Sequence, residues 1–398
     1  MKSHPTKIKW CAVCAMTAGP RGWIEEEVFV SSDAYLDRLS TALDGARHAI
    51  DLEVYIFQLD ALGEKFADRL SAAAARGVVV RVVVDGIGSF GSIARLSERF
   101  CAAGVGFKVY HPVRFAPLMS WLIGLAGGDR SRRWMRTLNR RNHRKVCIID
   151  MREAWVGSIN ISAVHCSRSS GAEVWRDTGV RVRGEGVRIL RRSFERVWRR
   201  RLQWRSPGDR STTVASPAAI GLVRLNVKQR HRRRNARDLV QRVGAARQRV
   251  WITNAYFVPH GSLLRALAAA AKRGVDVRVL VPERADVFFM PWVAAYFYER
   301  LLRGGVRLFE YTRSMLHAKS IVIDDWGLIG SSNLNQRSLQ HDLEVDLVVQ
   351  QPGSLALLGE SFEDDLRHAV ELRSVEWGRF SLVRRVGGAI AFALRRWL

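Results

Sequence analysis

Several features that mark common classes of protein are scarce in this sequence. Only five of its 398 residues are cysteines, and their odd number and scattered spacing do not indicate a disulfide framework. Cys11 and Cys14 have the spacing of a zinc-ligand pair, but no second pair or histidine cluster follows at zinc-finger distance. No segment reaches the roughly 18 uncharged apolar residues that a membrane-spanning helix requires. The sequence therefore predicts a protein of a reducing compartment without a spanning helix.

Acidic residues are also scarce relative to basic ones. There are 38 aspartates and glutamates against 64 lysines and arginines, which gives a formal net charge of +26. This imbalance favours an anionic partner, either nucleic acid, an acidic membrane surface or a phosphorylated substrate. The sequence has no obvious carboxylate cluster for a divalent cation, so we expect neither a metal nor another cofactor. The length and the 47% of apolar residues predict a packed globular protein of two domains.

What the sequence does contain is an internal repeat. The stretch NHRKVCIID at 142–150 and the stretch LHAKSIVID at 316–324 carry histidine, lysine and aspartate at the same spacing. Each copy is followed by Gly-Ser-x-Asn, in WVGSINIS and in LIGSSNLN. The shared residues are His143, Lys145, Asp150, Ser158 and Asn160 in the first copy and His317, Lys319, Asp324, Ser331 and Asn333 in the second. One copy alone would be a weak match, but two copies at equal offsets are a specific signal.

The repeat extends upstream of both motifs. RHAIDLEVYIF (47–57) resembles RQRVWITNAYF (247–257), and LSAAAARGVVVRVVVD (70–85) resembles LAAAAKRGVDVRVLVP (267–282). Strands that alternate with helical stretches in this way predict two α/β halves, each with a mixed or parallel β-sheet flanked by helices. The expected segments are an N-terminal extension at 1–21, a first domain at 22–205, a linker at 206–219, a second domain at 220–375 and a C-terminal amphipathic segment at 376–398.

Two segments are candidates for contact with a membrane. The first half is longer than the second, and its extra residues, at about 111–139, include the uncharged stretch 115–128 and an arginine-rich flank. The stretch LVRRVGGAIAFALRRWL at 382–398 surrounds a short apolar core with arginines and a tryptophan. Such segments either lie in the lipid interface or pack on a domain as ordinary helices, and both interpretations stay open. The basic run at 229–238 is most simply a solvated helix face, although arginines near anionic lipid are attracted to it.

The paired motifs suit phosphodiester chemistry. Alternate residues of a strand share one face, so the histidine and the lysine of each motif are expected to point together. Asp150 and Asp324 follow at an odd offset and are expected to fix the backbone outside the pocket. If the two halves face each other, one neutral histidine can attack phosphorus while the other protonates the leaving alkoxide. The two lysines, the two asparagines and the hydroxyls of Ser158 and Ser331 would hold the phosphate oxygens.

A histidine nucleophile also needs a hydrogen-bond partner for its second ring nitrogen. Aligning WRDTGVRV (175–182) with DLEVDLVV (342–349) places Asp177 opposite Glu344. We therefore expect Asp177 to orient His143 and Glu344 to orient His317, although an acid at the start of a strand is also common without such a role. The sequence alone leaves the two histidines interchangeable as nucleophile and acid.

These motifs resemble those of the phospholipase D superfamily, whose members share duplicated His-Lys-Asp motifs. The flanking phrases LEVYIFQLDALG (52–63), ITNAYFVP (252–259) and GSSNLNQRSLQHDLEV (330–345) are most similar to bacterial cardiolipin synthases of that superfamily. The similarity covers about residues 22–372 and implies two phospholipase D-like α/β halves related by pseudo-two-fold symmetry, with the active site between them. The catalytic residues that it implies are those of the two motifs, His143, Lys145, Asp150, His317, Lys319 and Asp324.

The resemblance further implies an activity. A phosphatidyl group would pass from phosphatidylglycerol to His143, releasing glycerol, and then to a second phosphatidylglycerol, with His317 as acid and base. The enzyme would act without a cofactor, bound peripherally to the cytoplasmic side of the inner membrane. Its partners would be anionic phospholipid and the membrane surface rather than nucleic acid. The acceptor lipid and the oligomeric state stay open.

Other functions use the same residues. In a phospholipase D-type hydrolase water replaces the second lipid, and headgroup exchange would use another alcohol. The charge of +26 also suits a nuclease, but the apolar stretch 115–128 has no purpose on DNA, and spaced aromatics for base stacking are not evident. A non-catalytic membrane scaffold is disfavoured because both motifs are intact.

Overall fold

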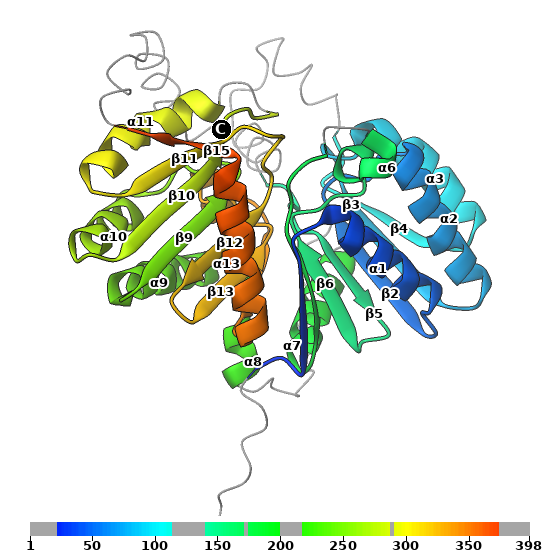
Figure 1. The fold of residues 1–398 in the computed structure, drawn as a ribbon. Coiled ribbons are helices and arrows are strands. Elements are labelled where there is room, and N and C mark those ends of the chain that lie inside the picture. The colour runs from blue at the N-terminus through cyan, green and yellow to red at the C-terminus, as the bar shows by residue number, and fades with distance from the viewer. Residues whose placement is uncertain (1–21, 114–139, 171–173, 200–216, 287–289, 374–398) are drawn as a thin grey trace, which may run out of the picture.

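The computed structural model describes residues 22–113, 140–170, 174–199, 217–286 and 290–373, which form two β-sheets with helices on their outer faces and between them (Figure 1). The candidate membrane segments 115–128 and 382–398 lie outside the described residues, as do the extension 1–21 and most of the linker 206–219. None of the described helices is both long and apolar enough to cross a membrane.

The first sheet has the strand order β1-β7-β6-β5-β2-β3-β4. Its strands are β1 (Glu25–Phe29), β2 (Ala49–Val54), β3 (Val79–Asp85), β4 (Gly106–Tyr110), β5 (Val146–Ile149), β6 (Glu153–Gly157) and β7 (Gly179–Arg183). β2, β3 and β4 are parallel, whereas β5, β6, β7 and β1 pair antiparallel with their neighbours. The helices of this half are α1 (Ser32–Asp44), α2 (Ala61–Ala75), α3 (Ile93–Ala102), α6 (Ser167–Ser170) and α7 (Gly186–Trp198), with 3₁₀ turns at Phe90–Ser92 and Ala163–His165.

The second sheet has the order β15-β11-β10-β9-β12-β13-β14-β8. Its strands are β8 (Val223–Leu225), β9 (Arg249–Asn254), β10 (Asp276–Pro282), β11 (Arg307–Tyr311), β12 (Lys319–Ile323), β13 (Trp326–Gly330), β14 (Val345–Val349) and β15 (Ala369–Leu372). Again β9, β10 and β11 are parallel and the motif strand β12 is antiparallel to β9. The helices are α8 (Pro217–Leu222), α9 (Gln229–Ala245), α10 (Gly261–Lys272), α11 (Met290–Arg303), α12 (Gln336–Gln340) and α13 (Pro352–Arg367).

The two halves have the same topology. β4, β3, β2, β5, β6, β7 and β1 of the first sheet correspond in order to β11, β10, β9, β12, β13, β14 and β8 of the second, which adds only β15 at its edge. The predicted fold class, two α/β halves with mixed sheets flanked by helices, is therefore confirmed. The edge strands β1 and β8 were not evident in the sequence.

The local sequence explains why these elements form. β3 reads VVRVVVD, a β-branched run suited to a central parallel strand that is covered on both faces. α2 is capped by Asp60, whose carboxylate accepts hydrogen bonds from the backbone of Leu62 and Gly63, and the helix buries Phe66 and Leu70 on one face. It ends just before Gly77, which has a φ of +87°, a value that favours glycine. Gly274 has a φ of +89° at the matching place after α10, so the repeat preserves this turn.

Each half also covers part of the other. α7 of the first half packs on β8 of the second, and α13 of the second half packs on β1 of the first. Both helices lie between the two sheets in Figure 1. One continuous hydrophobic core contains Val180 and Val182 of β7 together with Leu347 and Val348 of β14. Because apolar side chains of both halves are buried in this shared core, we expect the halves to unfold together.

The backbones of the halves are paired at two further places. Asn142, just before the first motif, forms a bridge with Leu343 of the second half. Arg176, before β7, forms the corresponding bridge with Leu316, just before the second motif. The chain therefore exchanges equivalent segments between its halves, and this exchange positions the site described next.

Candidate active site

Each motif histidine lies where its own half is bound to the other. His143 donates its backbone N–H to the carbonyl of Leu343 over 3.0 Å, and His317 donates to the carbonyl of Arg176 over 2.8 Å. The prediction that histidine and lysine share one strand face is only partly correct, because β5 begins at Val146 and β12 at Lys319. The residues before these strands leave their own sheet because their backbone groups pair across to the other half.

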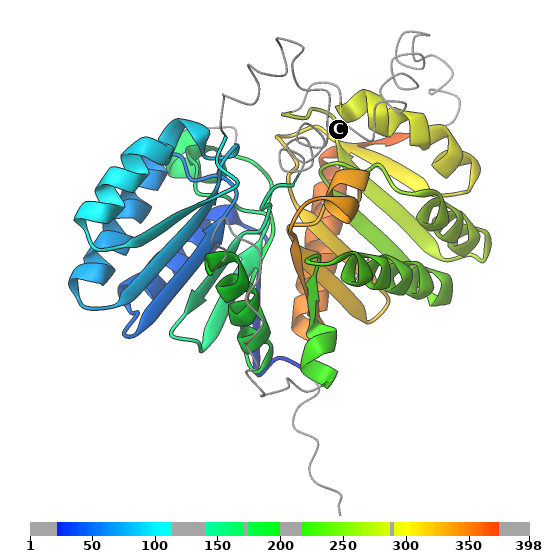
Figure 2. The ribbon, with the colours of Figure 1, turned by 180° about the vertical axis from the view of Figure 1, so that it is seen from behind.

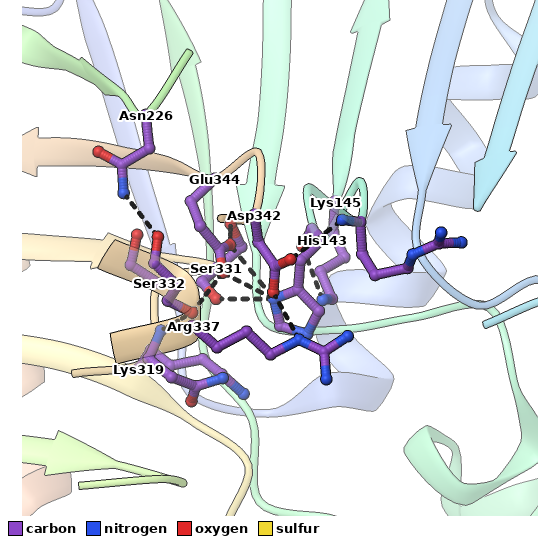
Figure 3. Close-up of polar contacts among 12 residues, drawn as sticks. His143, Lys145, Asn226, Lys319, Ser331, Ser332, Arg337, Asp342 and Glu344 are labelled. Carbon is purple, nitrogen blue, oxygen red and sulfur yellow. Dashed lines mark hydrogen bonds and ion pairs between the residues drawn. The ribbon is translucent and has the colours of Figure 1, made fainter. Parts of the chain in front are cut away.

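His143 is held by a carboxylate of the second half. Its Nδ1 lies 3.1 Å and 3.2 Å from the two carboxylate oxygens of Glu344, and 3.2 Å from the carbonyl oxygen of Ser331 (Figure 3). Glu344 is fully buried and also accepts hydrogen bonds from the hydroxyls of Ser331, at 2.5 Å, and Ser338, at 2.6 Å. The ring of Tyr55 contacts His143 edge-on with centroids 4.9 Å apart. Since Nδ1 faces the carboxylate, Nε2 is the ring nitrogen that can react with phosphorus.

His317 is held in the same way by a carboxylate of the first half. Its Nδ1 lies 2.7 Å from Oδ1 of Asp177. Asp177 also accepts hydrogen bonds from the hydroxyl of Ser158 and from Nδ1 of His165, both over 2.6 Å. The indole of Trp175 lies beside the ring of His317, with centroids 5.3 Å apart. These partners again leave Nε2 of the histidine as the reactive nitrogen.

The predicted pairing of acids with histidines is therefore wrong. We expected Asp177 to orient His143 and Glu344 to orient His317, but each carboxylate contacts the histidine of the opposite half. The reason is the exchange of backbone segments. Pairing of Asn142 with Leu343 brings His143 next to Glu344, and pairing of Arg176 with Leu316 brings His317 next to Asp177.

The role predicted for two serines also needs correction. Ser158 and Ser331 are completely buried, and their hydroxyls donate to the carboxylates of Asp177 and Glu344. A hydroxyl hydrogen that is engaged in this way is not available to a phosphate oxygen. The two serines therefore orient the acids that orient the histidines.

The charged groups form one cluster across the interface. Burial lowers the pKa of Lys145 to about 8, although Glu344 and Asp177 raise it. Burial and the charge of Lys145 lower the pKa of Lys319 to about 7, again against the effect of both acids. Since each lysine interacts with the acids of both halves, the two motifs share one site, and His143, Lys145 and Lys319 lie together in Figure 3.

The two carboxylates differ in their protonation. Burial raises the pKa of Asp177, but its contacts with His165 and His317, both of which donate hydrogen bonds to it, outweigh that effect and hold this pKa well below its usual range. Burial raises the pKa of Glu344 to about 7, which Lys145 and the two serines only partly offset. Burial and the neighbouring lysines keep the pKa of both motif histidines well below the usual value. Both imidazoles are therefore neutral before substrate binds. Of the two carboxylates, Asp177 is fully ionised near neutral pH and Glu344 is not.

A family model described as cardiolipin synthase, PLD-like domain, matches residues 39–198 and 239–366. The chain belongs to this phospholipase D-like family. Each of the two matched segments contains one copy of the motif, so the family accounts for the internal repeat.

Two relatives of the chain are named cardiolipin synthases. The chain is 31% identical over 348 residues to a cardiolipin synthase of Halalkalibacterium halodurans, with 84% of this chain and 64% of that protein covered. It is 29% identical over 375 residues to cardiolipin synthase 2 of Bacillus cereus, with 91% and 68% covered. The chain therefore spans about two thirds of the length of the curated relatives that it matches.

Solved structures share the fold at low sequence identity. A phosphatidylserine synthase of Haemophilus influenzae matches with a TM-score of 0.63 over 93% of each chain at 13% identity. A polyphosphate kinase of Porphyromonas gingivalis matches with a TM-score of 0.55 over 86% of this chain and 50% of that one, at 14% identity. At such identities the likeness concerns the arrangement of the two halves alone.

The motif aspartates of this phospholipase D-like chain lie away from the histidines. The carboxylate of Asp150 accepts backbone hydrogen bonds from Arg47, His48 and Ala49, at 2.7 to 3.0 Å for the shortest contact to each. Asp324 accepts from the backbone of 247–249 in the same way. Both aspartates have a positive φ, +52° and +49°. They fix the turn after the motif strand to the start of β2 or β9, which is the backbone role expected for them.

Asn160 and Asn333 are buried next to the motifs. The side-chain oxygen of Asn160 lies 3.3 Å from the backbone nitrogen of Ile56, which donates to it. The side-chain oxygen of Asn333 is buried and has no hydrogen-bond partner within the described residues. The oxygen of Asn333 is therefore a buried polar group whose hydrogen-bonding capacity the described residues leave unused.

His165, Trp175 and Ser338 were missed by the sequence reasoning. The signal for two of them was present, because His165 follows Asn160 at the same offset at which Ser338 follows Asn333. The two residues bind the acid of their own half, His165 to Asp177 and Ser338 to Glu344. Their different residue types hid the equivalence.

One cluster has the composition of a metal site. Ligand atoms of His165, Asp177 and His317 lie within 4.8 Å of one another, and all three residues are buried. Both histidines, however, direct Nδ1 at separate oxygens of a single carboxylate, at hydrogen-bond distances of 2.6 and 2.7 Å. Of the three residues only Asp177 is an acid, and the neighbouring lysines add positive charge to the site. The arrangement therefore fits a hydrogen-bonded relay better than a metal centre.

Proposed function

We propose that this protein is a cardiolipin synthase that transfers a phosphatidyl group between two phosphatidylglycerol molecules and releases glycerol. The observation that carries the proposal is the symmetric pair of carboxylate–histidine contacts, each formed across the interface of the halves. It supplies two oriented imidazoles beside two buried lysines, as a two-step phosphoryl transfer requires. The names of the relatives support the lipid substrate and the product.

In the first step Nε2 of His143 attacks phosphorus, and the bond from phosphorus to the glycerol oxygen breaks. His317 gives its proton to that oxygen, so glycerol leaves as the neutral alcohol. In the second step His317 takes the proton from a hydroxyl of the second phosphatidylglycerol. That oxygen then attacks phosphorus, breaks the phosphorus–nitrogen bond and restores His143.

Lys145 and Lys319 are the proposed ligands of the phosphate oxygens, with the amides of Asn160 and Asn333 beside them. Both lysines are almost fully buried, and each depresses the pKa of a motif histidine. A bound phosphodiester anion offsets the lysine charge. It therefore raises the pKa of His317 toward the value that a general acid needs.

The roles of the histidines follow from their partners. His317 faces Asp177, whose lowered pKa keeps it ionised and so stabilises an imidazolium. His143 faces Glu344, whose pKa near 7 makes it a weaker anion, and it keeps more of its side chain exposed, 13% against 7%. A group that must carry a proton suits the first environment, and a neutral nucleophile suits the second.

The activity is tested by incubating the purified chain with phosphatidylglycerol vesicles and resolving the lipids by mass spectrometry. We expect cardiolipin and glycerol in equal amounts. Phosphatidic acid without cardiolipin would instead identify a hydrolase, and cleavage of DNA with no lipid product would reject both lipid activities.

The roles are tested with a phosphatidyl donor whose leaving group is p-nitrophenol, which departs without a proton. A His317→Ala variant should release one equivalent of nitrophenol in a burst and then stall as a phosphohistidine on His143, seen by intact mass. A His143→Ala variant should give no burst. The opposite pattern would assign the nucleophile to His317.

We also propose that the protein binds peripherally to membranes that contain anionic phospholipid. The charge of +26 supports this, and the substrate of the proposed reaction is itself such a lipid. Flotation with liposomes of increasing phosphatidylglycerol content tests it, and binding that is independent of that content would contradict it.

A further inference from the structure

One face of α9 is composed almost entirely of arginine. Arg230, Arg233, Arg234 and Arg237 follow one another at helical i, i+3, i+4 and i+7 spacing, and all four are exposed. The opposite face of the helix buries Leu239 and Val243. We call the four residues the α9 arginine face.

This face is unfavourable for the helix that carries it. Arginines near a helix N-terminus oppose the helix dipole, and like charges three or four residues apart repel each other. α9 has no side-chain hydrogen bond at its N-cap and no acidic residue in its first turn to offset these effects. Within the described residues none of the four arginines forms an ion pair with a carboxylate. The part of the chain that the structure describes therefore offers no carboxylate partner for this concentration of charge.

The repeat supplies an internal comparison. α1 precedes β2 as α9 precedes β9, and the buried positions agree, with Leu39 and Leu43 of α1 matching Leu239 and Val243 of α9. At the positions of Arg233 and Arg237, however, α1 carries aspartates. The arginine face is thus not required by the fold, since the equivalent helix does without it.

The arginine face lies at the active-site end of the second half. α9 runs toward the start of β9, so its N-terminal turns, which carry the four arginines, lie beside the end of β9 where Asn254 pairs with Lys319. Figure 2 shows α9 in green on the outer side of the second sheet, close to the short orange helix α12. The guanidinium of Arg232 in α9 binds the carbonyl oxygens of Gln340, His341 and Asp342. The next residues of that segment bind His143.

Other basic residues extend this surface. Burial lowers the pKa of His231, and the charges of Arg230, Lys228, Arg196 and Arg234 lower it further. Arg196 belongs to α7 of the first half, so the positive region crosses the boundary between the halves.

The positive region also reaches the motif. Arg140, which precedes the first motif, lowers the pKa of Arg232 after the effect of burial, and it lowers the pKa of His341 after burial, Arg232 and Arg337. The surface therefore runs from α7 across α9 to the residues that flank the site.

We propose that the α9 arginine face docks the protein on an anionic lipid bilayer and so brings the site between the halves to the membrane surface. The inference rests on the proposed function, because a lipid-transferring enzyme must meet its substrate at such a surface. Exposed guanidinium groups along one helix suit a plane of lipid phosphates. A nucleic acid is the other polyanion of this kind, but α9 carries no phenylalanine, tyrosine or tryptophan on which bases could stack.

The test replaces all four arginines by glutamine in the full chain. The matched control replaces four exposed basic residues at the opposite end of the sheets, Arg47, Arg152, Arg247 and Lys272. Both variants lose the same net charge. In a third variant the four α9 arginines become lysines, which keeps the charge and should keep most of the binding.

Binding is measured by co-sedimentation with vesicles of phosphatidylglycerol and phosphatidylcholine at low salt. We expect the glutamine variant to bind at least about tenfold more weakly, up to about a thousandfold if every arginine contacts lipid. The control should stay within about threefold of the wild type. Equal losses in the glutamine variant and the control would show that net charge alone decides, and unchanged binding of the glutamine variant would also overturn the proposal.

Two further readouts separate this proposal from its alternatives. Binding to a DNA duplex, measured in place of vesicle binding, tests whether the partner is a nucleic acid. If the glutamine substitutions weaken duplex binding but not vesicle binding, the lipid proposal is overturned. Turnover of a short-chain phosphatidylglycerol dissolved as monomers should be unchanged in the glutamine variant, while turnover on vesicles falls. A last outcome separates the two proposals. If the wild type makes no cardiolipin, and the glutamine variant still binds vesicles more weakly than the wild type, the docking surface stands and the proposed function fails.

Discussion

Replacing Asp177 by asparagine tests the role of the carboxylate–histidine pairs most directly. Asp177 accepts three short hydrogen bonds, from Ser158, His165 and His317, and only 1% of the residue is exposed. An asparagine has a single acceptor oxygen and carries no charge, so it cannot serve both histidines. We expect His317 to lose its oriented tautomer and the anion that stabilises its imidazolium.

The size of the effect follows from burial. Removing one partner of a buried charged pair costs about 3–5 kcal/mol. If most of that cost falls on the transition state in which His317 carries a proton, kcat for cardiolipin formation falls by about 10²- to 10⁴-fold. The assay is cardiolipin production from phosphatidylglycerol vesicles, followed over time by mass spectrometry.

A donor with a p-nitrophenol leaving group shows whether the loss concerns proton transfer. Because this leaving group needs no proton, the first turnover of the Asp177→Asn variant should stay within about tenfold of the wild type. A Glu344→Gln variant, which alters the partner of the nucleophile, should slow that first turnover as well. Equal losses of the Asp177→Asn variant on both donors, or activity within fivefold of wild type, would refute the assigned role of His317.

Three further predictions concern neighbouring groups. A His165→Ser variant, which copies Ser338 of the other half, should fold normally, and its kcat should be about tenfold lower with little change in KM. A shift of its pH–rate profile would distinguish this positioning role from a purely structural one. The pKa of Glu344 is raised to about 7, so its folded form binds more protons than the unfolded chain between about pH 4.5 and 7, and stability falls as pH rises through this window. The free energy of unfolding of the Glu344→Gln variant, relative to that of the wild type, should therefore be higher at pH 7.5 than at pH 5 by up to about 3 kcal/mol. Thermal unfolding at the two pH values measures this difference, and a difference that does not depend on pH would contradict the prediction. An Asp150→Asn substitution weakens a turn that three backbone amides hold, so we expect it to lower the free energy of unfolding by about 1–3 kcal/mol and to leave kcat per folded molecule unchanged. A fall in kcat without a fall in Tm would instead assign Asp150 to the chemistry.

The fold could be predicted because its signal is local and duplicated. Runs such as VVRVVVD at 79–85 and DVRVLVP at 276–282 indicate central strands by themselves, and the second copy confirms each assignment made from the first. The edge strands β1 and β8 had no such signal. They depend on packing against α13 and α7 of the opposite half, which is a tertiary effect.

The site was predictable in its residues but not in its contacts. His143, Lys145 and their counterparts are identified by the duplicated spacing of the two motifs alone. The partner of each histidine does not, since Asp177 and Glu344 stand at equivalent places in both halves. Only the bridges from Asn142 to Leu343 and from Arg176 to Leu316 show which acid meets which histidine.

The same exchange is consistent with the two different chemical roles that we propose for the histidines of this duplicated chain. Each histidine is oriented by an acid of the other half, so neither half alone contains a complete pair. Three equivalent positions then differ between the environments of the two pairs. In the alignment of the two halves, His165 is equivalent to Ser338, Trp175 to Asp342 and Tyr55 to Ala255.

These differences act through the partners of the histidines. His165 helps to keep Asp177 ionised, which favours an imidazolium on His317. On the other side Ser338 is a neutral donor, and Glu344 keeps a pKa of about 7. Exchanging serine and histidine between positions 165 and 338 should therefore move proton affinity from one motif histidine to the other. If the p-nitrophenol burst of the exchanged protein still depends on the same two histidines in the same order, the asymmetry of the roles has another origin.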